Sequence, residues 1–359
     1  MTSLPETYHI VGGGIAGLAA AWYLKRRYPG IRSVIYEAGE RLGGRAYSYD
    51  DAGLGIRLDN AVHAIISANR FMAAFVKKNE WIAKVPFLDM AGGGLSTSAF
   101  ANRGHILKSF CNTAPEEIAP SIKRNILRQT FPWTASTRKV WFSGQDLSQR
   151  IINMLAGYAD EVHLNCRLNK IAAQFGMAAQ LEFSTGQAEV GSRDKVIVAL
   201  DNLSCRKVLD IIPLEHNQIV NIIYQTSQRI YLPGGASLLG VTGGTVDWLF
   251  AGNGLLSAVI SDYHPQEDNL TGLAMKVWQE IDKIRGVNSA FMPPYKAFCC
   301  KNATIRQDEG NNLRRPRNAL TSYPNVFIAG DWTMQNYPCC METAVRSAIR
   351  AVKTAVKSV

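Results

Sequence analysis

Three glycines near the start of the chain have the spacing of a dinucleotide phosphate site. Gly12, Gly14 and Gly17 form the pattern G-x-G-x-x-G, and Glu37 follows twenty residues after the last glycine. The first glycine of this pattern permits a tight turn, the second lets the backbone approach a pyrophosphate, and the third lets a helix pack on a strand. A carboxylate at this distance can bind ribose hydroxyl groups. These residues predict that the chain binds a dinucleotide.

The elements that must hold these groups can be read from the same stretch. Residues 8–11 and 33–36 have the composition of short strands, and residues 18–27 have the pattern of a helix. A helix that begins after the glycines would present free N–H groups to the phosphates. An isolated G-x-G-x-x-G could also be a turn with no ligand. The ordered series of strand, glycines, helix, strand and acid favours the dinucleotide site.

Two further segments carry glycines and charged residues suited to a flavin dinucleotide. "ERLGGR" (residues 40–45) follows the second predicted strand, and "NVFIAGDWT" (residues 325–333) precedes a C-terminal amphipathic helix. Together with the first glycine motif, these segments resemble the FAD-dependent amine oxidase and phytoene desaturase superfamily. Its second dinucleotide motif is matched by Arg41, Gly43, Gly44 and Arg45.

The resemblance implies that FAD is the cofactor and that both ends of the chain build its site. Gly330 and Asp331 would approach the ribityl and pyrophosphate groups, and a helix beginning near Met341 would direct its positive N-terminus at the isoalloxazine ring. The residues expected to contact FAD are Gly12, Gly14, Ile15, Ala16, Gly17, Glu37, Ala38, Arg41, Gly43, Gly44, Arg45, Asn60, Val162, Gly330, Asp331, Met341, Glu342 and Ala344.

Several stretches resemble one branch of the superfamily, the hydroxysqualene dehydroxylases. "IRLDNAVHAIISANR" is similar to its Asp-Asn-Gly-x-His segment, with Asp59, Asn60 and His63 matching. "GDWTMQNYPCCMETAVRSA" resembles its C-terminal signature, although Cys339 and Cys340 replace an expected Ala and Thr. Between residues 63 and 112 the chain is shorter than this branch leads us to expect. The resemblance implies that hydroxysqualene and reduced FAD give squalene, oxidised FAD and water.

This reaction needs an acid, a dry cavity and electron-rich walls for an allylic cation. His63 is a candidate proton donor, with a structural histidine as the alternative reading. Glu342 could act at the flavin edge or cap its helix. The residues expected to contact substrate are His63, Trp248 and Tyr337. The aromatic residues that could form the walls, or simply belong to the core, are Phe75, Trp81, Phe87, Phe131, Trp133, Trp141 and Trp248.

The predicted fold class is α/β, with a Rossmann-like FAD-binding domain of the amine-oxidase type interleaved with a smaller α+β substrate domain. The FAD-binding domain would comprise residues 1–65, 145–205 and 298–359. Residues 66–144 would form a helical first part of the substrate domain. Residues 206–297, with alternating patterns at 218–226 and 255–261, would form its sheet.

The charge and cysteine content restrict the partners. Lys and Arg exceed Asp and Glu by ten, which suggests an anionic partner, but no nucleic-acid module is recognisable. Residues 121–139 have the pattern of a basic amphipathic helix, which suits either a membrane surface or an ordinary solvated helix. Seven cysteines without ligand spacing indicate reduced thiols and no metal site. We therefore expect a cytoplasmic protein that contacts the inner face of the membrane or none, with its oligomeric state open.

Three functions remain open on the sequence. The first is dehydroxylation of hydroxysqualene, a small lipid substrate. The second is oxidation by a relative, a carotenoid desaturase of the phytoene type or an amine oxidase. The third is a non-catalytic FAD-binding partner protein, which the shortened substrate domain would suit.

Overall fold

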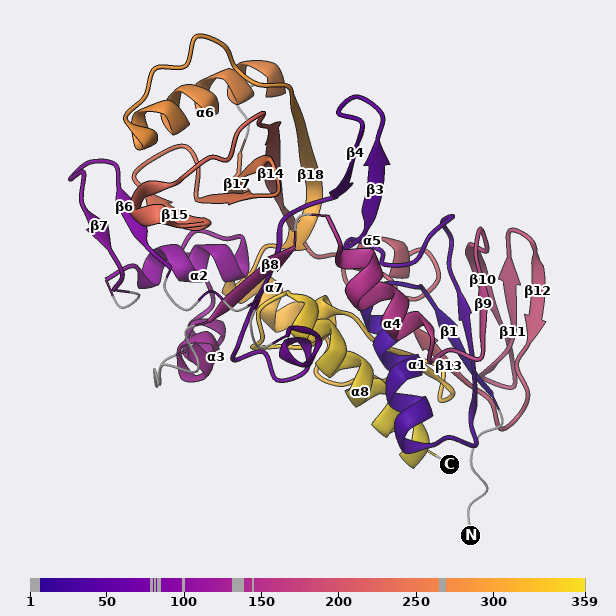
Figure 1. Ribbon diagram of the computed structural model, residues 1–359. Helices are drawn as coiled ribbons and strands as arrows, with labels where there is room; N and C mark the ends of the chain where they lie inside the picture. The colour runs from indigo at the N-terminus through magenta and orange to yellow at the C-terminus, as the bar shows by residue number, and fades with distance from the viewer. Residues whose placement is uncertain are drawn as a thin grey trace.

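The computed structural model describes residues 7–77, 80, 82, 85–98, 101–130, 139–143, 145–264 and 269–358. The two larger sheets lie in different halves of the molecule (Figure 1). Strands from both ends of the chain meet in the first of these sheets. The region around the first sheet is assembled from the beginning, the middle and the end of the chain.

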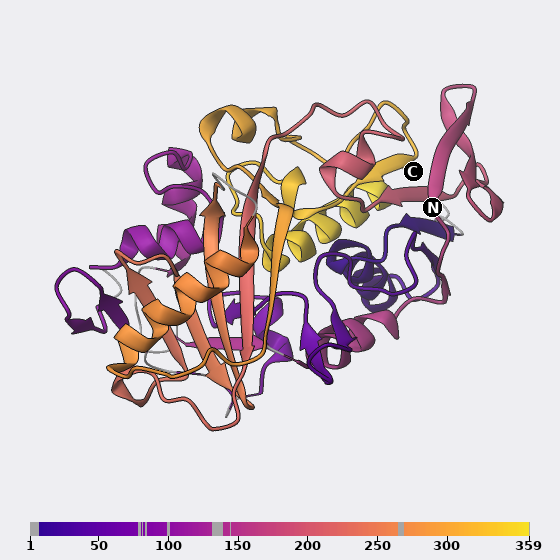
Figure 2. The same ribbon diagram turned by 90° about the horizontal axis from the view of Figure 1, so that it is seen from above.

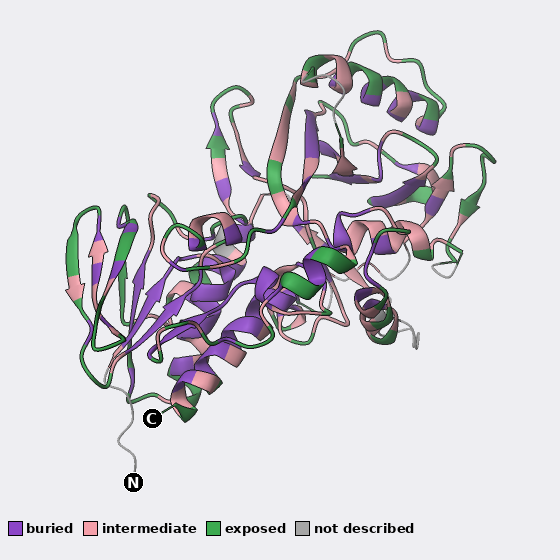
Figure 3. Ribbon diagram, turned by 180° about the vertical axis from the view of Figure 1, so that it is seen from behind, coloured by how far each residue is buried: buried purple, intermediate pink, exposed green. Residues whose placement is uncertain are grey.

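The first sheet has five parallel strands in the order β19-β13-β1-β2-β9. Strands β19, β13, β1 and β2 are largely buried on both faces, as parallel strands usually are, whereas the edge strand β9 is exposed (Figure 3). The bounds of the strands are β1 (Thr7–Val11), β2 (Arg32–Tyr36), β9 (Glu161–His163), β13 (Lys195–Val198) and β19 (Val326–Ile328).

Helices α1 (Ile15–Arg27) and α8 (Met341–Lys357) lie side by side on one face of this sheet (Figure 1). A small antiparallel sheet covers the other face, with Leu181 and Phe183 in the same core cluster as Val11 and Val34. Its strands are β10 (Leu168–Gln174), β11 (Met177–Phe183) and β12 (Gly186–Glu189). The first and last helices of the chain therefore share one core.

The second sheet has seven strands in the order β18-β14-β17-β16-β15-β6-β7. Helix α6 (Leu270–Arg285) covers one face, where it buries Val277 and Ile281 (Figure 2). The strands are β6 (Phe87–Asp89), β7 (Leu95–Ser96), β14 (His216–Gln225), β15 (Leu238–Thr242), β16 (Trp248–Gly252), β17 (Leu255–Tyr263) and β18 (Tyr295–Ile305).

The remaining elements lie in the segments that link these strands and helices. Two short antiparallel pairs are β3 (Ser48–Asp51) with β4 (Ile56–Asp59) and β5 (His63–Ile66) with β8 (Val140–Ser143). The connecting helices and helical turns are η1 (Met72–Phe75), α2 (Arg103–Cys111), α3 (Pro120–Thr130), η4 (Ser148–Ile152), α4 (Asn153–Ala156), α5 (Asn202–Cys205), η5 (Pro233–Gly235), α7 (Glu309–Arg314) and η6 (Asp331–Thr333).

The helical prediction for residues 66–144 is wrong for the first part of that segment. Its apolar pattern near Phe71 and Phe75 forms only the single turn η1, whose start is held by hydrogen bonds from Phe71 N and Met72 N to the Glu342 carboxylate. The chain then extends as β6 and β7 at the edge of the second sheet. Among the described residues of this segment, α-helices follow later, as α2 and α3.

Candidate functional site

A cavity of about 870 Å³ is lined by residues of both sheets and of both chain ends. One part of its wall is the glycine turn between β1 and α1, and another is the face of the second sheet that α6 does not cover. The predicted residues that line it are Gly12, Gly14, Ile15, Ala16, Glu37, Ala38, Gly43, Gly44, Arg45, Asn60, His63, Trp248, Gly330, Asp331, Met341, Glu342 and Ala344.

The three positions of the first motif require glycine for two different physical reasons. At Gly12, where φ is +105°, a Cβ would lie 2.6 Å from Ala199 O, and at Gly17 it would lie 1.9 Å from Gly12 O. Both glycines are thus required by the packing of the chain itself. At Gly14, φ is −74° and the nearest atom to a Cβ would be Gly44 Cα at 3.8 Å. The protein leaves room there, on the cavity side, which fits the close approach of a pyrophosphate.

The N-terminus of α1 offers free donors beside this space. Gly14 is its N-cap and provides no side chain to accept from the N–H groups of the first turn. Nearby, the Glu37 carboxylate accepts hydrogen bonds from Gly13 N at 2.7 Å and Gly39 N at 2.8 Å. The two backbone N–H groups fix the carboxylate at the cavity wall, where its remaining lone pairs can accept from ribose hydroxyls. These features fit a dinucleotide.

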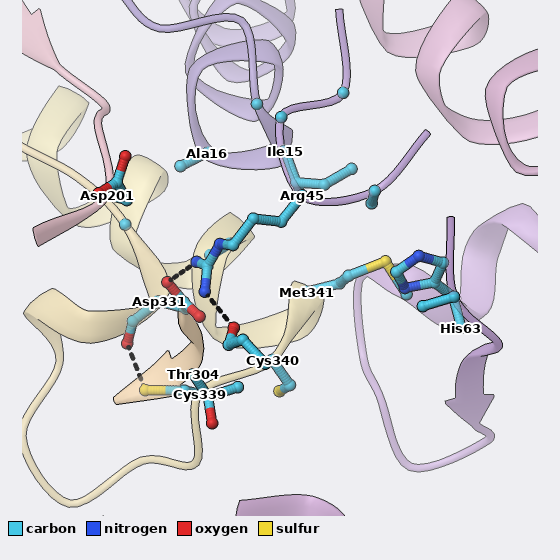
Figure 4. A pocket seen from close by; sticks show the side chains of 18 of the residues that line it. Ile15, Ala16, Arg45, His63, Asp201, Thr304, Asp331, Cys339, Cys340 and Met341 are labelled. Carbon is cyan, nitrogen blue, oxygen red and sulfur yellow. Dashed lines mark hydrogen bonds and ion pairs between the residues drawn. The ribbon is translucent and has the colours of Figure 1, made fainter. Parts of the chain in front are cut away.

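Arg45 and Asp331 join the second glycine segment to the C-terminal motif (Figure 4). Arg45 Nη2 lies 2.6 Å from Asp331 Oδ1, and Arg45 Nη1 donates to Ala303 O at 2.8 Å. The charge of Asp331 raises the pKa of Arg45 above its ordinary value. This ion pair connects residues 286 positions apart in the sequence and places a cation at the cavity wall, where a pyrophosphate would need one.

The N-terminus of α8 also reaches the cavity, through Met341, Glu342 and Ala344. Its N-cap, Cys340, makes no side-chain capping hydrogen bond. Burial raises the pKa of the Cys340 thiol, and raises that of Cys339 to about 12. Both thiols are therefore neutral near pH 7, so neither adds a negative charge at the positive end of the helix.

Glu342 is a structural carboxylate by its contacts. Its Oε2 accepts from Phe71 N at 2.9 Å and Met72 N at 3.0 Å, while its Oε1 accepts from Arg346 Nε at 2.9 Å. The side chain is 4 % exposed. Both oxygens are thus engaged in holding η1 to α8. The carboxylate therefore holds the start of η1 instead of capping its own helix, whose N-cap is Cys340, and a role at the flavin edge stays a prediction.

His63 lies beside Met341 in the cavity wall (Figure 4). Its Nε2 is 3.1 Å from Asn60 Oδ1, which also accepts from Tyr47 N, while Asn60 Nδ2 donates to Arg45 O. The Asn60 oxygen is an acceptor in this network, so His63 Nε2 carries the hydrogen. Burial lowers the pKa of His63 to about 4. The ring is therefore neutral near pH 7, which favours a structural histidine over a proton donor.

The depressed pKa of His63 predicts a pH-dependent stability difference. The unfolded ring protonates below about pH 6.5 while the folded ring stays neutral to about pH 4, so folding loses stability as the pH falls through this window. We expect His63→Gln, which does not titrate, to lose less. Relative to the variant, the wild type should lose up to about 3 kcal/mol between pH 7 and pH 4. Urea unfolding of both proteins at several pH values measures this, and parallel profiles would contradict it.

Four predicted residues do not line the cavity. Gly17 supports the packing of α1, and the Arg41 guanidinium lies 3.8 Å from the centre of the Tyr47 ring. The Tyr337 carbonyl accepts from Arg315 Nη1. Val162 pairs with Ile35 at the edge of the first sheet, with its side chain 37 % exposed.

Residues 166–169, shortly after Val162, line the cavity and were not predicted from the sequence. Residues 166–169 follow β9 and form part of the wall, and Cys166 N donates to Glu37 O at 2.7 Å. Because β9 runs parallel to β2, the chain after the strand, rather than its middle, reaches the carboxyl edge where the cavity lies. The position of Glu37 after β2 was the signal that could have located this stretch.

The wall formed by the second sheet is mostly apolar. Its cavity-lining residues are Ile219, Asn221, Leu238, Trp248, Phe250, Val259, Ser261, Cys300, Ala303 and Thr304. Of the other aromatic candidates, Phe87 contacts Trp248 edge-on with ring centres 5.6 Å apart, Phe75 packs against the core of the first sheet, and Trp141 lines a smaller cavity of about 280 Å³. Trp81, Phe131 and Trp133 lie outside the described residues.

The basic helix predicted from residues 121–139 corresponds in part to α3. Its apolar residues Ile122 and Ile126 are buried against Leu107 and Cys111 of α2, while Arg124 is exposed. This packing favours an ordinary helix face over a free membrane-binding face. No helix in the described ranges is both long and apolar enough to span a bilayer. Those ranges also contain no cluster of three or more His, Cys, Asp or Glu suited to a metal ion.

Comparisons with known proteins agree with this geometry. The family model of flavin-containing amine oxidoreductases matches residues 136–356, and that of NAD(P)-binding Rossmann-like domains matches residues 10–78. Hydroxysqualene dehydroxylase of Sinorhizobium fredii is 25% identical over 98% of this chain and 99% of its own length. That of Zymomonas mobilis is 26% identical, with 97% and 98% covered. A putative protoporphyrinogen oxidase from Exiguobacterium has the same fold, with 16% identity, 99% of both chains covered and a TM-score of 0.69.

The sequence alignment also bears on chain length. The alignment with the Sinorhizobium protein spans 423 positions, whereas this chain has 359 residues, so at least 64 positions have no counterpart in this chain. This is a difference in total length, and the expected shortening between residues 63 and 112 stays a prediction.

Proposed function

The chain belongs to the flavin-containing amine oxidoreductase family and is an FAD-dependent oxidoreductase; from this premise we propose that it removes the hydroxyl group of hydroxysqualene to give squalene. The relatives with that name align over nearly the whole chain. The observation that carries the proposal is the single cavity that joins the glycine turn at Gly14 to the apolar wall of the second sheet.

The distribution of charge in the cavity supports a neutral lipid over an amine. Among the described residues, the carboxylates that line it are Glu37, Asp201, Asp331 and Glu342. None of them lies on a strand of the second sheet, and Asp331 and Glu342 are paired with Arg45 and Arg346. A substrate ammonium group against the sheet would lack a counter-ion there, whereas a hydrocarbon chain would be well solvated by the apolar side chains.

The proposed reaction converts an allylic alcohol, a hydride and a proton into a hydrocarbon and water. Reduced FAD, when bound, supplies the hydride. The apolar wall excludes water from the carbon that loses its oxygen, and the face of Trp248 can stabilise positive charge that develops on it. Neutral His63, which donates its Nε2–H to Asn60, orients the loop after β4.

The test is a single turnover without oxygen. Photoreduced holoenzyme mixed with hydroxysqualene should form one equivalent of squalene per flavin, with the flavin reoxidised at the same rate. Extraction and mass analysis measure the product, and absorbance measures the flavin. Oxidised holoenzyme whose flavin is instead reduced by a primary amine, with the imine as product, or by a polyene that gains a double bond, would assign the oxidising relatives' chemistry. A yellow protein that is inert toward both alcohols and amines would assign a non-catalytic FAD-binding protein.

A further inference from the structure

Asn221 is a buried polar residue in the cavity wall, and the described residues supply no hydrogen-bond partner for its side-chain oxygen. It lies on β14, is 2 % exposed and lines the main cavity. Its side-chain Oδ1 is buried and has no partner. Buried side-chain amides are almost always hydrogen-bonded, because leaving one unpaired costs free energy. An unpaired amide at a cavity wall therefore indicates a group that binds there.

The sheet register places Asn221 in an apolar surface. Val259 of β17 and Phe298 of β18 stand directly opposite it on the two neighbouring strands, and Trp248 of β16 is opposite Val259. Ile219 is the next residue of β14 on the same face. An apolar residue at position 221 would continue this surface without cost, so the amide is not explained by the packing of the sheet.

Ser261 is the neighbouring polar residue on this surface. It stands opposite Ile219 on β17, diagonal to Asn221, and lines the same cavity. Diagonal neighbours in an antiparallel sheet are close enough to act on one ligand group. Its backbone N–H donates to Asp247 Oδ2 at 2.6 Å, which fixes this part of β17.

The chemistry of these groups selects a hydroxyl. A side-chain amide both donates and accepts, and so does an alcohol, so one alcohol can accept from Asn221 Nδ2–H and donate to Oδ1 or to Ser261 Oγ. A hydrocarbon can do neither. A carboxylate or phosphate would need a cation, and the lining residues of this sheet include none. We propose that Asn221, assisted by Ser261, binds the hydroxyl group of the isoprenoid alcohol.

This inference rests on the proposed function, because it assigns a partner to the hydroxyl that the reaction removes. It also gives the site a preference for substrate over product. The alcohol satisfies the Asn221 amide, whereas the hydrocarbon product leaves it unpaired, so the product should bind more weakly and leave. The surrounding apolar residues contact the chain of both molecules alike and contribute no preference.

The experiment compares binding of hydroxysqualene and squalene to oxidised holoenzyme in detergent, followed by tryptophan fluorescence. We expect Asn221→Leu to bind the alcohol about tenfold more weakly and squalene as tightly as the wild type or more tightly. Asn221→Ser should recover part of the preference. Ile219→Val, on the same strand and face, is the matched control and should weaken both ligands equally. Flavin absorbance and urea unfolding verify that each variant is folded and loaded.

Equal losses for both ligands in Asn221→Leu, or no preference for the alcohol in the wild type, would overturn the assignment. Should Asn221→Leu fail to fold, Ser261→Ala provides the same comparison, with a smaller loss confined to the alcohol expected and an equal loss for both ligands contradicting it. A wild type that prefers the alcohol through Asn221 but forms no squalene in the single-turnover assay would refute the proposed reaction and leave the hydroxyl site intact.

Discussion

Gly14→Val is expected to weaken the binding of FAD while leaving the fold intact. A Cβ at Gly14 meets nothing closer than Gly44 Cα at 3.8 Å, and the φ of −74° suits any residue. The valine side chain would project into the cavity space that a pyrophosphate must enter to reach the N-terminus of α1. Overfilling such a space costs about 1–3 kcal/mol, which corresponds to a roughly 5- to 150-fold weaker affinity for FAD. Flavin titration followed by fluorescence measures it.

Two other glycines provide the controls for this prediction. Gly17→Ala should destabilise the apoprotein itself, because its Cβ would lie 1.9 Å from Gly12 O, so the loss would appear in urea unfolding without FAD. Gly30→Ala, where no atom lies within 4 Å of the added Cβ, should change neither stability nor flavin affinity. If Gly14→Val retained full flavin affinity, the cavity beside α1 would not hold the pyrophosphate. If its apoprotein unfolded like that of Gly17→Ala, the position would be structural.

The predictable parts of this site are those where a single residue type has a single physical reason. A glycine whose Cβ would collide with Ala199 O, or a carboxylate at the end of a strand, is specified locally, so Gly12 and Glu37 could be placed from the sequence. The strands at 8–11 and 33–36 and the last helix follow from apolar patterns that local sequence determines. Such features need no knowledge of distant segments.

The parts that could not be predicted depend on contacts between distant segments. The run around Phe71 has helical spacing, yet its backbone N–H groups donate to Glu342, 271 residues later, and the chain leaves the helical path after one turn. Asn221 gives no signal in the sequence, since only the register with Val259 and Phe298 reveals that it is a lone amide in an apolar face. Val162 does not line the cavity for the same reason. The parallel pairing of β9 with β2 determines that the residues after β9, and not Val162 in its middle, reach the cavity.

Glu342 is one of these contacts between distant segments, because it connects α8 to η1. Its carboxylate is in the first turn of α8, whose other residues pack on α1, and it accepts from the backbone of η1 in the segment that leads to the second sheet. Arg346, one turn later, supplies the charge that compensates it, with Nη2 at 2.8 Å. Among the described residues, Glu342 is the side chain that accepts from Phe71 N and Met72 N.

Glu342→Ala is therefore expected to cost about 3–5 kcal/mol of unfolding free energy, because it leaves two backbone N–H groups and the Arg346 guanidinium without their partner in a buried setting. Urea unfolding of the apoprotein measures this loss. Glu309→Ala is the matched control: Glu309 also lies in the first turn of a helix, α7, but is exposed, and its removal should cost less than about 1 kcal/mol. The double variant Glu342→Ala/Arg346→Met should lose less than the sum of its single variants, since one interaction is removed twice. Additive losses would contradict the interaction between Glu342 and Arg346. A Glu342→Ala protein that is as stable as Glu309→Ala, but cannot reoxidise its flavin with substrate, would assign Glu342 to the reaction instead of to the contact between η1 and α8.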